Sequence, residues 1–154
     1  MKKGLFTLAL AAIGLAACDN FEASSNGALD GYWQMTHVDT LATGRSADMT
    51  DRMILWAVQS ELIELSDRHE GEPFDEHYPS IFYHFERMQN TLILLGDPKP
   101  RVNNRVKSDS DIANDNECEF YGLSSRGDTL NILQLENKKM TLQTKALRMY
   151  FRKF

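Results

Sequence analysis

Apolar and polar positions alternate along the chain from Asp128 to the C-terminus. In the last two runs of this segment, polar side chains separate Met140 from Leu142 and Met149 from Phe151. This period of two predicts two antiparallel strands with one apolar face. A turn between them pairs Leu142 with Met149, and the next inward pair is then Met140 with Phe151. A slip of one residue would turn the apolar face to water, so the pattern specifies the register.

A third strand precedes this hairpin and continues its apolar face. Leu135 is expected opposite Met140. Two residues earlier, Leu133 is expected opposite Leu142. The apolar positions before Leu133 are out of phase by one residue, and such a shift predicts a β-bulge. The chain therefore ends in a three-stranded meander whose apolar face needs a partner.

Earlier parts of the chain also predict strands. Residues 80–88 and 91–95 alternate around a turn, which predicts a hairpin with Phe85 opposite Leu94. Residues 30–38 are rich in aromatic and β-branched side chains, a composition typical of a strand.

One of the remaining segments allows two assignments. Residues 52–66 have apolar positions at helical spacing, yet their central run also suits a bent or broken pair of strands, and periodicity alone does not separate these readings. Residues 97–111 are charged and predict a long loop. A short helix is expected next, capped by Asp111 and ended by Gly122. The 97–119 segment is a candidate docking surface for a protein partner.

The first 17 residues predict an export signal. Two lysines precede an apolar run that ends near Leu15 and is too short to span a bilayer. Small residues then lead directly to Cys18, and this pattern resembles the bacterial lipobox. The resemblance implies cleavage before Cys18 and acylation there, which would anchor the protein in a membrane, with the outer membrane as the expected address. Residues 18–29 would then be the lipidated cysteine and a flexible tether.

Residues 30–154 are expected to form one domain. Removing residues 1–17 leaves 137 residues with 15 basic and 22 acidic side chains, a formal net charge of −7. That length supports one hydrophobic core. The acidic balance argues against nucleic acid as a partner, and membrane contact should come through the acyl anchor. Cys118 would have no partner in the chain, so we expect it to be a small buried filler and expect no disulfide.

No motif indicates a reaction, so we expect no enzyme activity, cofactor or metal. The acidic and amide residues at 109–117 suggest a calcium loop, but Ala113 stands at a ligand position and the required glycine is absent. The four histidines lack the close spacing with a carboxylate base that zinc enzymes use. Surface acidity explains the acidic run better than a metal site.

The first predicted strand carries a more specific resemblance. Gly31-Tyr32-Trp33 is similar to the Gly-x-Trp opening of lipocalins and related calycin barrels. The chain after the signal also resembles the small lipocalin-like lipoproteins of Gram-negative gut bacteria, whose functions are mostly unassigned. The resemblance implies an all-β fold, an antiparallel meander barrel of about eight strands with one short helix before the last three. For residues 52–66, the resemblance favours the pair of strands and not the helix. It also implies that Gly31 and Trp33 close the barrel base, with Arg152 packed across the tryptophan.

Two functions remain open at this point. A closed barrel of this size can enclose one small ligand, and its inward side chains would then form the site. His37 is in phase with the inward positions and would add a polar contact. Alternatively, the same side chains fill the core, and the protein is a non-enzymatic envelope adaptor that docks a partner protein. An apolar cavity favours the first function and a filled interior the second. The expected lining residues are Trp33, Met35, His37, Phe85, Leu94, Leu142 and Met149.

Overall fold

The computed structural model describes residues 24–68, 79–102, 105–106, 112–124 and 126–154. The predicted export signal, the predicted acylation of Cys18 and the first part of the predicted tether lie outside these residues. Within them, no helix has the length and apolarity needed to cross a bilayer.

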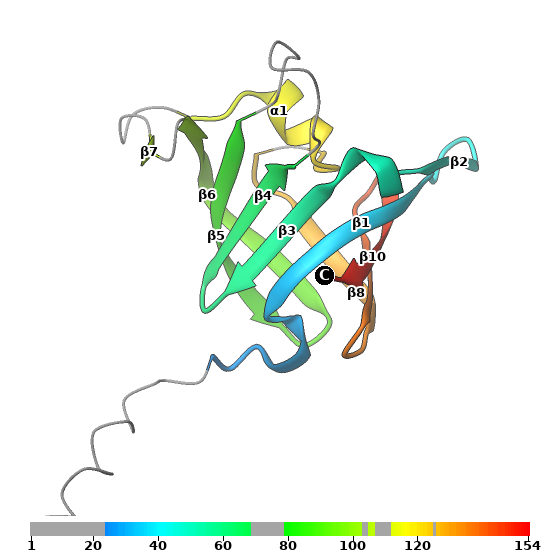
Figure 1. Ribbon diagram of the computed structural model, residues 1–154, viewed down its shortest axis with the longest axis horizontal. Coiled ribbons are helices and arrows are strands. Elements are labelled where there is room, and N and C mark those ends of the chain that lie inside the picture. The colour runs from blue at the N-terminus through cyan, green and yellow to red at the C-terminus, as the bar shows by residue number, and fades with distance from the viewer. Residues whose placement is uncertain (1–23, 69–78, 103–104, 107–111, 125) are drawn as a thin grey trace, which may run out of the picture.

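Ten strands, one α-helix and two short 3-10 helices make up the described fold. Eight strands form a closed barrel in the order β10-β9-β8-β6-β5-β4-β3-β1, and pairing of β10 with β1 closes it (Figure 1). The strands β2 and β7 are short additions to β1 and β6. In chain order, the elements are η1 (Gly27–Leu29), β1 (Gly31–Thr40), β2 (Arg45–Asp48), η2 (Thr50–Arg52), β3 (Ile54–Gln59), β4 (Leu62–Asp67), β5 (Ser80–Met88), β6 (Thr91–Val102), β7 (Arg105–Val106), α1 (Asp115–Phe120), β8 (Thr129–Leu135), β9 (Lys139–Gln143) and β10 (Leu147–Lys153).

The barrel has two ends that are used as reference points below. The base is the end at which the chain enters β1, and it carries the β3–β4, β5–β6 and β8–β9 turns and the end of β10. The top carries α1, the β9–β10 turn and the β1–β2 hairpin, which projects sideways from the wall (Figure 1). Antiparallel neighbours joined by short turns place alternate turns at opposite ends.

The predicted meander register is confirmed for the last hairpin. Leu142 pairs with Met149, and Met140 pairs with Phe151. Leu135 also pairs with Met140, but Leu133 does not face Leu142. The predicted bulge lies at Leu133 itself, so Ile132 takes the inward place and Leu133 is exposed.

The other strand predictions are also confirmed. Phe85 pairs with Leu94 in the β5–β6 hairpin, and residues 52–66 contain the β3–β4 strand pair. The long loop predicted for residues 97–111 is wrong in its first part, because β6 continues to Val102. There Pro98 and Pro100 are buried. Proline suits this stretch because β8 pairs with β6 only at Thr91–Ile93, which leaves the later part of β6 near a sheet edge.

The helix α1 begins later than predicted. Asn114 caps it in place of Asp111, which lies outside the described residues. The Asn114 side chain accepts from the Glu117 amide, and the Glu117 carboxylate accepts from the Asn114 amide, which forms a capping box. Gly122 ends the helix as predicted, with φ at +89°. The Leu123 amide donates to the Cys118 carbonyl, completing a Schellman motif.

Candidate functional site

Six of the seven expected lining residues lie inside the barrel. Trp33, Met35, Phe85, Leu94, Leu142 and Met149 are each at most 4% exposed and belong to one continuous apolar cluster. Trp56, Tyr83 and Phe151 belong to the same cluster, which occupies the space between the strands. The described interior is therefore lined by the chain's own buried apolar side chains.

The base of the barrel is closed around Trp33. The indole Nε1 donates to the Leu29 carbonyl at 2.7 Å, which ties η1 to the first strand. The Lys153 ammonium lies 4.8 Å from the centroid of the indole ring and donates to the Ala28 carbonyl at 3.0 Å. A cation over an indole face is a favourable contact, and here it covers the ring from below.

The prediction that Arg152 packs across Trp33 is wrong, because the neighbouring residue Lys153 takes that position. Alternation along β10 places Lys153 on the Trp33 side, whereas the Arg152 Nε donates to the Gln34 side chain at 2.8 Å on the outer face. Gly31 has φ at +120°, and a Cβ there would lie 2.8 Å from the Lys153 Cε. The backbone conformation therefore requires glycine at Gly31, and a side chain there would also displace the end of Lys153.

The top of the barrel is closed by α1 and the residues after it. The Tyr121 hydroxyl donates to the Pro79 carbonyl at 3.0 Å, and the Tyr83 hydroxyl lies 3.3 Å from the Cys118 sulfur. Cys118 is fully buried and is not in a disulfide. Burial raises the pKa of the Cys118 thiol, and the Tyr83 hydrogen bond offsets part of that rise. Gly122 packs directly on Met149, because a Cβ there would overlap the Met149 sulfur.

One polar atom inside the barrel has no partner. Trp56 is fully buried on β3, its ring centroid lies 5.1 Å from that of Phe151, and its Nε1 makes no hydrogen bond in the described structure. A buried donor left unpaired costs about 1–3 kcal/mol. The interior thus presents one uncompensated hydrogen-bond donor among apolar side chains.

The placement of His37 differs from the expectation. The β1 register shifts between Met35 and His37, so the β-bulge at Thr36 turns His37 to the outer face of the sheet. The imidazole packs against the Tyr150 ring with centroids 5.5 Å apart. His37 therefore makes no contact inside the barrel.

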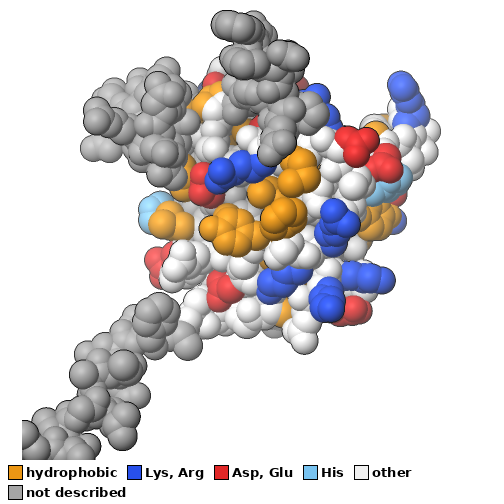
Figure 2. All heavy atoms as spheres, in the orientation of Figure 1, with side chains coloured by type: hydrophobic (Ala, Val, Ile, Leu, Met, Phe, Trp, Pro, Cys, Tyr) orange, Lys and Arg blue, Asp and Glu red, His pale blue; other side chains and the backbone are white. Residues whose placement is uncertain are grey.

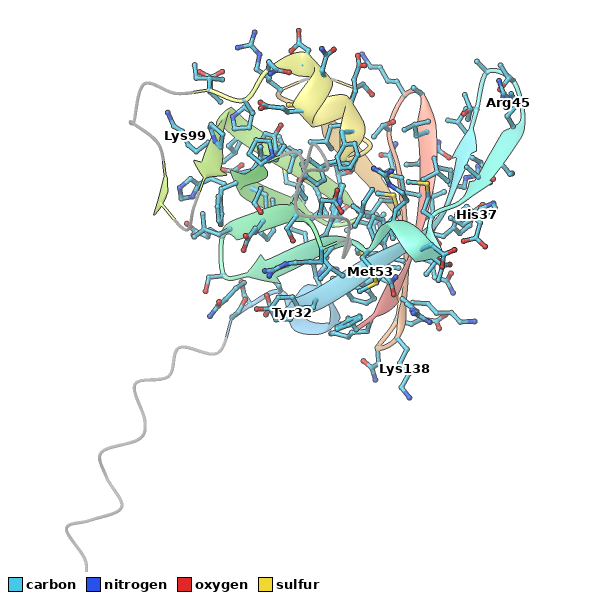
Figure 3. All side chains as sticks on the ribbon, turned by 45° about the horizontal axis from the view of Figure 1, so that its top comes forward. Tyr32, His37, Arg45, Met53, Lys99 and Lys138 are labelled. Atoms are coloured by element: carbon cyan, nitrogen blue, oxygen red, sulfur yellow. The ribbon has the colours of Figure 1, made fainter. Side chains whose placement is uncertain are left out.

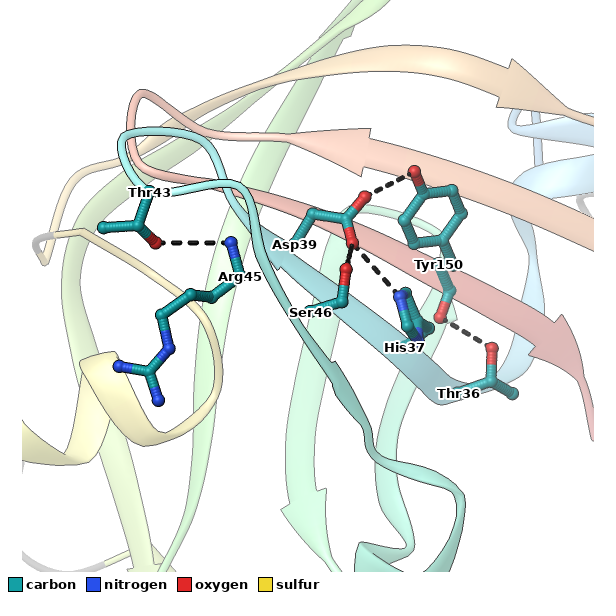
Figure 4. A network of polar contacts seen from close by, with 7 residues as sticks. All are labelled: Thr36, His37, Asp39, Thr43, Arg45, Ser46 and Tyr150. Carbon is teal, nitrogen blue, oxygen red and sulfur yellow. Dashed lines mark hydrogen bonds and ion pairs between the residues drawn. The ribbon is translucent and has the colours of Figure 1, made fainter.

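His37 belongs instead to a polar network on the β1–β2 ribbon (Figure 4). Asp39 is its centre: its carboxylate accepts from the Ser46 hydroxyl, from the Tyr150 hydroxyl at 2.8 Å, and lies 3.1 Å from the His37 Nε2. These hydrogen bonds, that of Ser46 first, lower the pKa of Asp39. The network joins β2 and β10 to β1.

This network has the residue types of a hydrolase but not the arrangement. In a catalytic triad, histidine lies between serine and carboxylate and accepts the serine proton. Here the Ser46 hydroxyl donates to Asp39, and the lowered pKa of Asp39 makes it a weak base. The geometry therefore stabilises the ribbon rather than activating a nucleophile. Within the described residues, no three His, Cys, Asp or Glu side chains are placed to hold a metal ion.

Two open hollows lie on the outside of the barrel at its base. The larger has a volume of about 790 Å³ and is bordered by residues of β5 and β6, among them His84, Met88 and Leu95. The smaller, of about 440 Å³, is bordered by Leu133 and its neighbours on β8. Asn26 and Arg87 border both hollows, so both lie beside the point where the chain enters the barrel.

Comparison with known proteins agrees with this architecture. The sequence model of the lipocalin-like domain matches residues 13–154. The chain belongs to the lipocalin-like domain family. Its fold is similar to the crystal structure of a lipocalin-like protein from Bacteroides uniformis, with a TM-score of 0.59 and 16% identity over 83% of this chain and all of that one. An uncharacterized protein from Bacteroides eggerthii is similar at a TM-score of 0.56 and 15% identity, covering 81% of this chain and 98% of that chain. No curated protein matches the chain.

Sequence reasoning missed two residues of this lipocalin-like barrel. Trp56 lies in residues 52–66, whose periodicity fits both a helix and strands. The sequence therefore did not determine whether its side chain faces into the barrel or outward. Lys153 is adjacent in sequence to Arg152, and the alternation of β10 alone would have identified it as the residue on the inward side with Phe151.

Proposed function

We propose that this protein is a lipid-anchored envelope lipoprotein whose barrel binds a small apolar ligand carrying one hydrogen-bond acceptor. The observation that supports this proposal is the unpaired Nε1 of Trp56 inside the barrel. A ligand oxygen that accepted from this donor would remove the cost of leaving it unpaired, while the surrounding side chains would cover the apolar part of the ligand. Carbonyl, ether and hydroxyl oxygens all meet this requirement.

Space for the ligand would come from flexible side chains. Met35, Met140 and Met149 all belong to the interior cluster, and Phe151, which touches Trp56, pairs with Met35 and Met140 across the strands. Methionine has three rotatable bonds and adapts its shape more readily than branched side chains. A small ligand would make room for itself by displacing these side chains.

The top is the proposed entrance. The top is closed by α1, a helix of only six residues. Contacts of Tyr121 with Pro79 and of Cys118 with Tyr83 hold the helix there, so entry would require α1 to move. Gly122, in a left-handed conformation at the end of α1, can act as a hinge for its movement.

The proposed anchor is the acylated Cys18. It depends on the lipobox resemblance, and the outer membrane is the proposed address. Because only eight residues separate Cys18 from η1, the base of the barrel would stay within about 30 Å of the acylated residue. Growth in labelled palmitate, followed by mass spectrometry of the N-terminal peptide, tests acylation directly, and a Cys18→Ala variant is the control.

Native mass spectrometry tests the ligand. The chain from Asn20, which contains every strand of the barrel, is purified from bacterial cells without detergent and weighed before and after denaturation. A reproducible extra mass that disappears on denaturation is expected. A bare polypeptide mass, unchanged after exposure to bacterial lipid extract, would refute ligand binding and favour the alternative, a non-enzymatic adaptor with a filled barrel. The cluster of buried apolar side chains that lies inside the barrel is the observation that favours that alternative.

A matched pair of probes tests the role of Trp56. Nonan-2-one and nonane have similar apolar bodies, but only the ketone accepts a hydrogen bond. We expect the original protein to bind the ketone about 2- to 10-fold more tightly than the alkane. In a Trp56→Phe variant, which keeps an aromatic ring but no donor, this preference should disappear. An equal preference in both proteins would show that Trp56 does not contact the ligand oxygen.

A further inference from the structure

Exposed apolar side chains gather at the base of the barrel. In the part of the chain that the structure describes, eight large hydrophobic residues are exposed, and five of them lie at the basal ends of their strands. The most exposed are Phe154 at 69% and Met88 at 61%. Only two of the eight, Leu41 and Ile112, lie toward the top. The five basal residues are Tyr32, Leu62, Met88, Leu133 and Phe154.

These five residues form a ring around the base rather than a patch on one wall. They come from β1, β4, β5, β8 and the residue after β10, so they follow one another around the closed sheet. Tyr32 and Phe154 adjoin, since the Phe154 amide donates to the Tyr32 carbonyl at 2.8 Å. Figure 3 shows Tyr32 toward the base, on the opposite side of the barrel from Arg45 and Lys99. We call these five residues the basal ring.

The surface around the basal ring carries balanced charge, whereas the whole chain has a net charge of −5. Within two residues of the basal turns and the strand ends there, the described residues include five Lys or Arg and five Asp or Glu. Figure 2 shows Lys and Arg side chains gathered on the lower part of the visible face, beside β1. The five cations are Arg87, Lys138, Lys139, Arg152 and Lys153, and the five anions are Asp30, Glu61, Glu64, Glu86 and Glu136.

The chain also enters the barrel at this end. Asn26 is held by its side chain, which donates to the Ser60 carbonyl at 2.6 Å, and by its carbonyl, which accepts from Arg87 at 2.8 Å. These contacts hold Asn26 at the base, so the described chain begins at this end of the barrel. The base is therefore the end of the barrel that is nearest in sequence to the proposed anchor.

We infer that the basal ring is a docking surface for the lipid bilayer itself, with the aromatic and aliphatic side chains in the headgroup region and the exposed lysines at the β8–β9 turn, Lys138 and Lys139, at the lipid phosphates. Aromatic rings with polar edges and long basic side chains are the groups that favour this interface. The barrel then stands upright on the membrane, and its top faces the aqueous phase. This inference uses the proposed anchor only for the direction of approach, because the ring is formed by the folded domain.

Vesicle flotation tests the inference without the anchor. The probe is vesicles of phosphatidylethanolamine and phosphatidylglycerol in a 3:1 ratio, and the protein is the chain from Asn20, which lacks Cys18. We expect measurable binding, and a Tyr32→Ser, Leu133→Ser, Phe154→Ser triple variant should bind about tenfold more weakly. Circular dichroism and cooperative unfolding establish that each variant is folded. Since Cys18 is absent, the result does not depend on acylation.

The matched control removes exposed apolar side chains from the other end. A Leu41→Ser, Ile112→Ser double variant changes residues that are 38% and 40% exposed near the top and should bind vesicles like the original protein. An equal loss in both variants, or no vesicle binding by the original chain, would overturn the inference. A dimer in solution that the triple variant abolishes would also overturn it, because the ring would then be an interface between two copies.

A positional readout tests the upright orientation. Asn137 and Lys145 are exposed turn residues at opposite ends of β9. Each is replaced by cysteine and labelled with an environment-sensitive dye, while the buried Cys118 remains unlabelled. We expect the emission of the dye at residue 137 to shift to the blue on vesicles and that at residue 145 to stay unchanged. The reverse pattern would place the top on the membrane and refute the orientation.

Discussion

Replacing Gly122 with alanine should destabilise the barrel through two separable effects. Gly122 has φ at +89°, a backbone conformation that an L-residue adopts only with strain. It is also buried, and a Cβ there would overlap the sulfur of Met149, a side chain with no exposed surface. The first effect acts on the backbone alone, and the second acts on the packing between α1 and the barrel.

The expected magnitude follows from these two contributions. A non-glycine residue in this conformation costs about 1–2 kcal/mol. Overpacking of a filled core by one methyl group costs about 1–3 kcal/mol. The Gly122→Ala variant should therefore lose about 2–5 kcal/mol of unfolding free energy, a large part of the stability of a domain of this size.

The assay is urea unfolding followed by the fluorescence of the two buried tryptophans, Trp33 and Trp56. Gly44→Ala is the matched control, because Gly44 also has a positive φ, +65°, but its Cβ would meet no atom within 4 Å. The control should lose only about 1–2 kcal/mol. The difference between the two variants measures the packing contribution.

A second variant locates the clash. In a Met149→Ala background, which removes the overlapping sulfur, Gly122→Ala should cost less than in the original protein by about 1–2 kcal/mol. The predicted clash between residue 122 and Met149 would be refuted by either of two results. One is that Gly122→Ala loses no more unfolding free energy than Gly44→Ala, and the other is that its loss is the same in the original protein and in the Met149→Ala background.

Three further predictions concern the base and the titrating groups. Lys153→Met should lower the unfolding free energy more than Arg152→Met in the same urea assay, because only Lys153 caps the base tryptophan, and an equal effect would contradict that assignment. Burial raises the pKa of the Cys118 thiol in the folded protein. The contribution of this thiol to the unfolding free energy should therefore be complete below the pKa of an unfolded cysteine, about 8.5, and decrease as the pH rises to about 9.5. Cys118→Ala should show a smaller fall, and an identical pH profile would refute the linkage. The pKa of Asp39 is lowered by its hydrogen bonds, so its contribution should be present above the unfolded pKa, about 3.9, and be lost as the pH falls through the folded pKa. Asp39→Asn should therefore lose less stability than the original protein between pH 5 and pH 3 in thermal unfolding.

Local patterns were sufficient for the hairpins. The alternation around Met140 and Phe151 determined both the strands and their register, because a slip would expose the apolar set to water. The same reasoning placed Phe85 opposite Leu94. Six of the expected lining residues were inward for this reason, and Gly122 was recognised as the end of the helix from its residue type alone.

The positions of the β-bulges depend on how the strands pair in the closed sheet. His37 has the inward phase in sequence, but β1 must pair with β10, β2 and β3, and the extra residue at Thr36 reverses its face. The bulge at Leu133 was expected, yet its position could be set only by pairing with β9. A bulge changes every side chain that follows it, so a prediction made from period alone fails beyond that point.

The sequence alone determined the class of fold, the likeness to lipocalins and most of the core, because these depend on periodicity and on short motifs. Only the tertiary structure decided that Lys153 covers Trp33, that Trp56 is buried without an acceptor, and that exposed apolar residues from four separate strands and the residue after β10 share one end. Each of these facts joins residues distant in the chain. Closure of the barrel brings such residues together, and no local pattern records which of them will meet.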